Sequence, residues 1–268
     1  MKLNNMNILE TKKMTKHFDG VYAVDSLSVG FEKGKITGLV GPNGSGKSTL
    51  INLLTGVIQI GSGSVVISSA EEVSKLLPHE VSDYGITRTF QEVRLFEQMP
   101  VLDNILVVLT KRNVFASLFE IHKKFHLDRA EEILKKVDLW DPPSPKASGG
   151  QGKRKQDRLA SELSYGQRKL LEIGRVLAMS NSFGDDSDIF FLDEPFAGLF
   201  PEMRKIVIFA IQDLKQKGKT VILVEHNIDI IRELCDHIIV LDNGKLLAEG
   251  KPDQVLSKRE VMDAYLGE

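Results

Sequence analysis

Residues 41–48 read Gly41-Pro42-Asn43-Gly44-Ser45-Gly46-Lys47-Ser48, which is the G-x-x-x-x-G-K-S spacing of a phosphate-binding loop. The loop follows the apolar run Ile36 to Val40 and opens a helix-like stretch, Thr49 to Val57. Its glycines allow a tight turn whose amides face a phosphate, and the helix N-terminus adds a positive dipole. We therefore expect the loop and Thr49 to bind a nucleoside triphosphate, with Lys47 reaching the β- and γ-phosphates and Ser48 offering its hydroxyl to Mg²⁺.

Length and charge narrow the class of protein. A chain of 268 residues with 42% hydrophobic content can bury the core of one α/β domain plus a smaller subdomain. The net charge of −2 and the pI near 6.3 give no general attraction for nucleic acid or for an anionic membrane. The sequence shows neither the roughly 18-residue apolar run of a spanning helix nor the pattern of a signal peptide. We expect an unprocessed cytoplasmic chain that meets a membrane only through a protein partner.

The residues around the loop predict further strands and helices. Ile8 to Phe31 alternates short apolar and polar stretches around turn residues, which indicates an antiparallel β region. Gly61 to Ser69 is typical of a turn and a strand, and Glu71 to Leu77 of a short helix. From Val101 to about Leu139 the apolar residues recur at helical spacing, which predicts a second, helical subdomain.

Asp141 to Ser161 has the composition of a linker. It holds three prolines, three glycines and the basic run Lys153-Arg154-Lys155. Proline and glycine interrupt regular elements and like charges prefer water, so we expect an exposed segment. A nucleic-acid contact is the alternative interpretation of the basic run, and a solvated loop is the more frequent one.

The remainder of the chain alternates helices and strands. The expected elements are the helix Tyr165 to Ala178, the strand Ile189 to Leu192, the helix Pro201 to Lys217, the strand Thr220 to Val224, the helix Asn227 to Leu234, and the strands Ile238 to Leu241 and Lys245 to Ala248. Asn243-Gly244 between the last two strands is a strong hairpin signal. Cys235, the only cysteine, is expected to be a buried thiol at the exit of its helix.

Two acids end one of these strands. The run Ile189-Phe190-Phe191-Leu192 leads directly into Asp193 and Glu194. In doubly wound sheets, ligands bind at the carboxyl edge of the strands, which is where such a run delivers its carboxylates. We expect Asp193 to hold Mg²⁺, directly or through water, and Glu194 to point toward the water that attacks the γ-phosphate.

Another helix start, Leu163-Ser164-Tyr165-Gly166-Gln167, precedes an apolar-striped helix. A serine hydroxyl and a glycine amide at a helix start form an anion site. With this motif the chain resembles the ATP-binding cassette (ABC) family, whose hallmark LSGGQ lies just upstream of the acid-ended strand. Tyr165 replaces the first glycine, a variant similar to that of ATPase subunits of branched-chain amino-acid importers.

The resemblance implies roles for further residues. Gln91, in Thr89-Phe90-Gln91, matches the glutamine that contacts Mg²⁺ and links the helical subdomain to the core. His226 matches the histidine that contacts the γ-phosphate, and Phe18 matches the aromatic residue that stacks on adenine. Catalysis would then rest on Lys47, Glu194, His226 and Gln91.

Two features depart from the family pattern. Ser148-Gly149-Gly150-Gln151 copies part of the hallmark, but charged and polar residues follow it, so we interpret it as a decoy within the linker. Phe200, in Ala197-Gly198-Leu199-Phe200, stands where the D-loop of the family usually has a polar residue. This substitution puts cross-talk between paired subunits through the D-loop in question.

The resemblance also implies the fold and the partners. The fold is an α/β P-loop NTPase with a RecA-like core, an antiparallel β subdomain and an inserted α-helical subdomain. The expected boundaries are 1–90 and 164–268 for the core and 91–163 for the helices, with the linker at 141–161. Two subunits would pair head to tail with each ATP between the phosphate loop of one and Ser164 to Gln167 of the other. Transmembrane permease subunits would dock near Thr89 to Asp103, which places the chain peripherally on the inner face of the cell membrane, without direct contact to nucleic acid.

Several alternatives stay open at this point. Gly85 to Gln91, followed by Arg94-Leu95-Phe96, and the ending Ala264 to Gly267 favour the amino-acid importer branch. ATPases for lipopolysaccharide export and urea uptake are similar. A soluble ABC ATPase acting on DNA or ribosomes predicts a coiled-coil insertion, a second cassette or a basic face, and the sequence shows none of them. A phosphotransferase would need an acceptor site, which is not recognisable.

Overall fold

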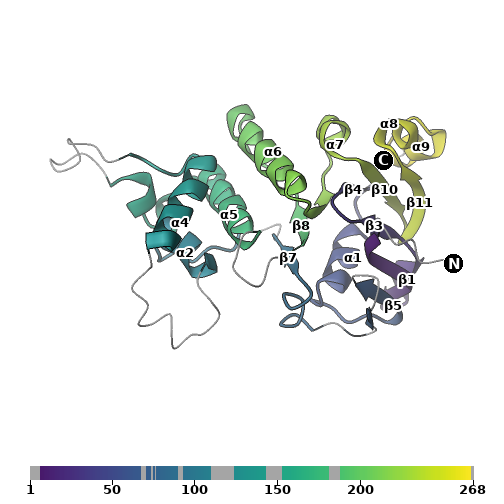
Figure 1. Ribbon diagram of the computed structural model, residues 1–268. Helices are drawn as coiled ribbons and strands as arrows, with labels where there is room; N and C mark the ends of the chain where they lie inside the picture. The colour runs from purple at the N-terminus through teal and green to yellow at the C-terminus, as the bar shows by residue number, and fades with distance from the viewer. Residues whose placement is uncertain are drawn as a thin grey trace. The chain divides into compact units, whose positions relative to one another are not determined.

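The computed structural model describes residues 7–67, 71–73, 75, 77–89, 93–109, 124–142, 153–180 and 188–266 (Figure 1). These residues form two compact units. The first falls within Met1–Arg88, Ser187–Glu194 and Leu214–Glu268, and the second within Thr89–Asp186 and Pro195–Asp213. Residues 164–180 and 195–213 thus group with the helices, although the prediction from the sequence puts them in the core. The boundaries drawn from the sequence stay a prediction.

The main sheet of the first unit has six strands in the order β11-β10-β4-β9-β8-β7. Their bounds are β4 Ile36–Val40, β7 Ile86–Arg88, β8 Ile189–Asp193, β9 Thr220–Val224, β10 His237–Asp242 and β11 Lys245–Gly250. Only β10 and β11 pair antiparallel, as the predicted hairpin. Val224 pairs with Leu39 on one side and with Asp193 on the other. The segments that follow β4, β8 and β9 therefore leave the sheet at one edge.

A second, antiparallel sheet confirms the predicted β region. It has the path β2-β1-β5-β6, with β3 also paired to β1, and the bounds β1 Asn7–Phe18, β2 Val21–Leu27, β3 Gly30–Glu32, β5 Ser62–Ile67 and β6 Glu71–Val73. The short helix expected from Glu71 is wrong, because residues 71–73 pair with β5. Hydrogen bonding along an available strand outweighs the helix propensity of two glutamates.

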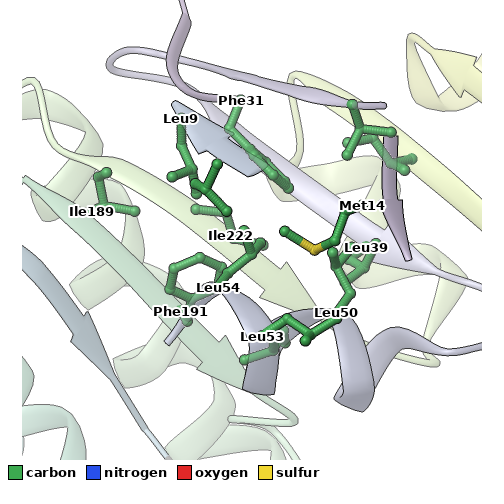
Figure 2. Close-up of a cluster of buried hydrophobic side chains, with 14 of the residues drawn as sticks. Leu9, Met14, Phe31, Leu39, Leu50, Leu53, Leu54, Ile189, Phe191 and Ile222 are labelled. Carbon is green, nitrogen blue, oxygen red and sulfur yellow. The ribbon is translucent and has the colours of Figure 1, made fainter. Parts of the chain in front are cut away.

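One hydrophobic cluster joins both sheets to helix α1, Lys47–Leu54 (Figure 2). Its fully buried members include Leu9, Met14 and Phe31 from the antiparallel sheet, Leu50, Leu53 and Leu54 from α1, and Leu39, Phe191 and Ile222 from the main sheet. Burial of a side chain of this size stabilises a fold by about 1.5–3 kcal/mol. The cluster therefore fixes α1, and with it the loop that precedes α1, to the sheets.

The first unit also contains helices in the last part of the chain. Helix α7, Ile228–Leu234, begins after Asn227, whose Oδ1 accepts hydrogen bonds from the amides of Asp229 and Ile230. Cys235 follows α7 and is buried as predicted; burial raises the pKa of its thiol to about 12, so the thiol stays protonated at neutral pH. The sequence analysis did not predict the last two helices, α8 Pro252–Leu256 and α9 Arg259–Leu266.

The second unit consists mainly of helices. They are α2 Val101–Leu109, α4 Lys124–Lys136, α5 Tyr165–Met179 and α6 Pro201–Gln216, of which α6 belongs to this unit as far as Asp213. Helices α2, α4 and α5 pack against one another. Buried Asn104 of α2 accepts from the amide of Phe96 and donates to the carbonyl groups of Phe96, Met99 and Pro100. Within the described chain, no helix has the length and apolar character to span a membrane.

Part of the predicted linker is packed. Short 3₁₀ turns, η2 Lys155–Asp157 and η3 Ala160–Glu162, lie within it. The amide side chain of Gln156 is buried and exchanges two hydrogen bonds, of 3.0 and 2.9 Å, with the backbone of Asp141. The expectation of an exposed segment is therefore wrong here, because two backbone groups capture a polar side chain.

The basic run of the linker is balanced by acids. The pairs are Lys153 with Glu162, Arg154 with Asp157, and Lys155 with Asp138. These pairs favour the solvated-loop interpretation over a nucleic-acid contact, because each cation already has an acidic neighbour. Residues 143–152, including the decoy Ser148 to Gln151, lie outside the described residues.

Candidate nucleotide site

The phosphate loop joins the carboxyl end of β4 to α1, as the sequence predicts. Gly46 caps α1 with a φ of 100°, and a Cβ at this position would lie 2.2 Å from the carbonyl oxygen of Ala23. Glycine is required here by both the dihedral angle and the space. No side-chain hydrogen bond caps α1. The turn of the β10–β11 hairpin supports the loop, since the amide of Gly244 donates to the Ser45 carbonyl at 3.1 Å.

Lys47 is folded back over the loop. Its Nζ donates to the carbonyl oxygens of Gly41 and Pro42, both at 2.8 Å, and lies 3.4 Å from the Ser45 hydroxyl. Lys47 is buried, whereas Ser48 is exposed in the first turn of α1. Buried ammonium groups need hydrogen-bond acceptors. The lysine is therefore already held at the loop, where phosphate oxygens can replace the carbonyl acceptors.

Asp193 ends β8 at the same edge of the sheet. It is buried, and its Oδ2 lies 3.2 Å from Nη2 of Arg88, the last residue of β7. The other terminal nitrogen of Arg88 donates to Asn52 and Thr55 at the end of α1. Arg88 was not among the residues predicted from the sequence, because nothing in the local pattern of β7 distinguishes it from a surface arginine.

Glu194 and His226 face each other across neighbouring strand ends. Oε1 of Glu194 lies 2.9 Å from Nε2 of His226, which can donate to the carboxylate when that nitrogen carries a proton. Glu194 has a φ of 46°, and its amide donates to the Val224 carbonyl at 3.0 Å. A left-handed backbone at a non-glycine residue is costly and concentrates at functional sites. The sequence analysis predicted both residues but not their contact or this conformation.

Glu225 holds the backbone that carries the histidine. Its side chain is buried, and its Oε2 accepts from the amides of His226 and Asn227 at 3.0 and 3.3 Å. Asn227 in turn caps α7. The position of His226 is therefore set by two polar neighbours that the sequence analysis did not select.

Phe18 lies at the end of β1 and is not part of the core. Its side chain is 47% exposed, and Nζ of Lys16 lies 5.3 Å from the centre of its ring. A cation at this distance over an aromatic face is attracted by the ring. The exposed ring is available to a ligand, and its stacking on adenine stays a prediction.

The segment Ser164 to Gln167, which we call the signature segment, starts α5 in the second unit. The Ser164 hydroxyl accepts from the Gln167 amide at 3.3 Å, and Gln167 Oε1 accepts from the Ser164 amide at 3.1 Å, which forms a capping box. Tyr165 packs over the D-loop, because a Cβ added to Gly198 would lie 2.8 Å from its ring. Phe200, in the same loop, is 74% exposed.

Gln91 lies outside the described residues, so its expected contact with Mg²⁺ stays a prediction. Across the ranges that are described, the structure contains no cluster of three or more His, Cys, Asp or Glu side chains suited to a metal. The predicted metal ligands Ser48 and Asp193 are one hydroxyl and one carboxylate, which suits a Mg²⁺ ion that keeps waters and binds phosphate oxygens.

The fold and the loop first define a class. The main sheet is mostly parallel. One of its strands passes through a G-x-x-x-x-G-K-S loop into a helix, and another, separated from it by β9, leads into two acids. This is the core of a P-loop nucleoside triphosphatase. The family described as ABC transporter matches residues 24–197. The chain belongs to this ABC transporter family and is an ATPase of the cassette type. The resemblance and the fold class inferred from the sequence are thereby confirmed.

Similar proteins cover almost the whole chain. The probable branched-chain amino acid transport ATP-binding protein LivG of Methanocaldococcus jannaschii is 36% identical over 271 residues, which cover 99% of each chain. The protein of the same name from Archaeoglobus fulgidus is 34% identical over 98% of this chain and 96% of its own length. The crystal structure of a nucleotide-free ATP-binding cassette from an ABC transporter has a TM-score of 0.77 at 34% identity and covers 98% of this chain and 100% of that chain.

Proposed function

We propose that this chain is the ATP-hydrolysing subunit of an importer for branched-chain amino acids. The observation that carries the proposal is the convergence of Lys47, Asp193 and the Glu194–His226 pair at one edge of the main sheet. The transported solute is inferred from the names of the relatives, several of which are branched-chain amino acid transport ATP-binding proteins.

The phosphate loop supplies most of the nucleotide affinity in this proposal. Residues 41–48 and Thr49 surround the phosphates, Lys47 exchanges its carbonyl acceptors for β- and γ-phosphate oxygens, and Phe18 stacks on adenine. Ser48, Asp193 and Gln91 would hold Mg²⁺, which would supply positive charge beside the phosphates.

Hydrolysis depends on Glu194 and His226. The carboxylate accepts a proton from the attacking water, and His226 hydrogen-bonds the γ-phosphate after its Nε2 leaves Glu194. Fixed charge at the place where charge develops lowers the barrier without reorganisation. The contact of 2.9 Å places both side chains at the same point of the sheet edge.

Ser164, Tyr165, Gly166 and Gln167 act on the ATP of a second ATPase subunit. The exposure of Ser164 and Tyr165 supports this role, because side chains that meet a partner must reach the surface. The two subunits pair head to tail, so that each ATP lies between a phosphate loop and a signature segment.

Transmembrane permease subunits recruit the chain to the inner face of the cell membrane. The docking region is Thr89 to Asp103, part of which is fixed by Asn104. Glu97 in this region is exposed and lies 3.7 Å from Arg168 of α5. Shape changes of the permease can therefore reach helix α5 through Glu97.

Reconstitution tests this function. The chain should co-purify with membrane subunits, and ATPase activity in liposomes should rise when branched-chain amino acid and its binding protein are added. Glu97→Lys should uncouple transport while it spares basal hydrolysis, whereas the matched surface variant Asp263→Lys in α9 should leave both unchanged. Recovery with ribosomes or DNA, without stimulation by any permease, would move the chain to the soluble class.

A further inference from the structure

We propose that Arg88 is a positioning residue that orients Asp193 for Mg²⁺ and locks it to the phosphate-loop helix. The proposal rests on the proposed function in so far as Asp193 is a ligand of the metal. Arg88 itself would touch neither nucleotide nor metal.

The register of the sheet brings Arg88 to Asp193. Strands β7 and β8 are parallel, and Arg88 pairs with Phe191, two residues before Asp193. Side chains two residues apart on a strand point to the same face. Phe191 belongs to the cluster that includes α1 (Figure 2), so Asp193 and Arg88 lie on the face that α1 covers.

Among the described residues, acceptors at the end of β8 and at the end of α1 hold the guanidinium. Nη2 donates to Asp193 Oδ2 at 3.2 Å, while Nη1 donates to Asn52 Oδ1 at 2.5 Å and to Thr55 Oγ1 at 3.2 Å. Thr55 gives its own hydroxyl proton to the Ile51 carbonyl at 2.7 Å, which leaves its oxygen to accept from Arg88. Arg88 thus bridges the end of β8 and the end of α1.

Burial makes this bridge rigid. The side chains of Arg88 and Asp193 are only 10% and 6% exposed. A buried carboxylate without a partner is strongly disfavoured, and a planar guanidinium can serve acceptors in two directions at once. An arginine fixed from both sides does not act as a mobile counter-ion that leaves when a metal arrives. It keeps the carboxylate in one orientation relative to the helix that carries Ser48.

Outer partners of this kind usually change metal affinity when they are removed. Loss of a residue that hydrogen-bonds a metal-ligating group typically weakens metal binding by about 10- to 100-fold. Arg88→Met should therefore raise the half-saturating Mg²⁺ concentration for binding of a non-hydrolysable ATP analogue by about this factor. Arg88→Lys keeps the charge but loses the planar guanidinium with its two terminal nitrogens, so it should raise the Mg²⁺ requirement by less. Thr55→Val should raise it by less still.

The control is a second ion pair, at the start of β8, in which the lysine is buried and the aspartate is 49% exposed. Lys219 lies 3.0 Å from Asp188, directly before β8 and at the opposite end of the strand from Asp193, and its side chain is 10% exposed. Lys219→Met and Arg88→Met should both lower the Tm of the metal-free protein, but only Arg88→Met should change the Mg²⁺ dependence. A purely structural role for Arg88 would make the two variants alike in both measurements.

The experiment measures Tm in EDTA and analogue binding against Mg²⁺ for the full chain and each variant. A wild-type chain that binds the analogue without any Mg²⁺ dependence contradicts the proposed function. Mg²⁺-dependent wild-type binding with an unshifted Arg88→Met contradicts the positioning role alone. If Arg88→Met does not fold, Arg88→Lys decides: a raised Mg²⁺ requirement supports the role, and an unchanged one overturns it.

Discussion

Two helix starts of this chain are proposed to act on nucleotide, and they are built in opposite ways. Helix α1 begins at Gly46, where no side chain caps the helix and the loop before it encloses a buried lysine. Helix α5 begins at Ser164, which caps its own helix through the reciprocal hydrogen bonds with Gln167. The first start consists of backbone amides and a cation, and the second is satisfied by its own side chains.

This difference indicates that the two helix starts have separate roles. A helix start without a side-chain cap gains hydrogen bonds and dipole energy when an anion arrives. At a start with a capping box, the Gln167 amide already donates to the Ser164 hydroxyl, so this amide is not available to an anion and only the hydroxyl proton of Ser164 is left for a ligand. We therefore expect the phosphate loop to bind ATP in a single subunit and the signature segment to act only after two subunits pair.

The largest expected effect concerns the site around the phosphate loop, where it distinguishes ATP hydrolysis from ATP binding. Glu194→Gln should lower the rate of ATP hydrolysis by roughly 10²- to 10⁴-fold, the usual contribution of a general base, while ATP affinity is kept. Lys47→Ala should instead weaken ATP binding itself. Single-turnover hydrolysis and equilibrium binding on both variants distinguish the two roles, and loss of ATP binding in Glu194→Gln would remove Glu194 from the catalytic assignment.

Phe18→Ala should have the next largest effect. Stacking on an aromatic ring is worth roughly 1–3 kcal/mol per base, so ATP should bind about 5- to 150-fold more weakly. GTP should bind measurably to the wild type, since a ring face discriminates poorly among bases. Tyr22→Ala, which removes a neighbouring exposed aromatic ring, is the control and should leave the affinity unchanged. Unfolding of Phe18→Ala without a nucleotide-specific defect would favour a structural role.

At the start of α5, Gly198→Ala tests the packing of the signature segment on the D-loop. Gly198 has a φ of 69°, and an alanine there costs roughly 1–2 kcal/mol for the left-handed backbone, before the contact with the Tyr165 ring is counted. Tyr165→Gly in the same chain should relieve the contact but not the backbone cost, which gives a favourable coupling in a double-mutant cycle of unfolding. If the effects of the two substitutions on the free energy of unfolding were additive, the Tyr165 ring would move aside from the added methyl group at no cost.

Ser164→Ala should have the smallest effect on the isolated chain. Loss of the helix cap should lower the free energy of unfolding by about 1 kcal/mol, and ATP binding to the monomer should stay nearly intact. Thermal unfolding and nucleotide titration on the same sample measure both quantities. A large loss of monomer affinity would mean that the two helix starts act together within one subunit, against the comparison above.

The sequence predicts the elements whose signals are local. Strand β9 has the expected bounds, α5 differs from its prediction by one residue, and the Asn243-Gly244 hairpin is present. Residues 71–73 escape prediction because pairing with β5, a non-local contact, determines their conformation. The same reason applies to Gln156, which is buried only because it meets the backbone of Asp141.

The candidate site follows the same rule. Its motifs are contiguous runs with fixed spacing, so the sequence identifies the phosphate loop, the acid pair and the signature segment. Arg88 depends on strand register, and the contact between Glu194 and His226 depends on strand order and on a positive φ. Strand register, strand order and this positive φ cannot be recognised from the neighbouring residues in the sequence. Only the structure therefore identifies the side chains that contact one another across neighbouring strands.

Sedimentation velocity with and without ATP tests the division between the two helix starts most directly. The Glu194→Gln chain, in which ATP hydrolysis should be slow, should shift from monomer to dimer when ATP and Mg²⁺ are added. Adding Ser164→Ala to that chain should abolish the shift while bound ATP per monomer stays the same. A double variant that dimerises as well as Glu194→Gln, or one that no longer binds ATP as a monomer, would contradict the account.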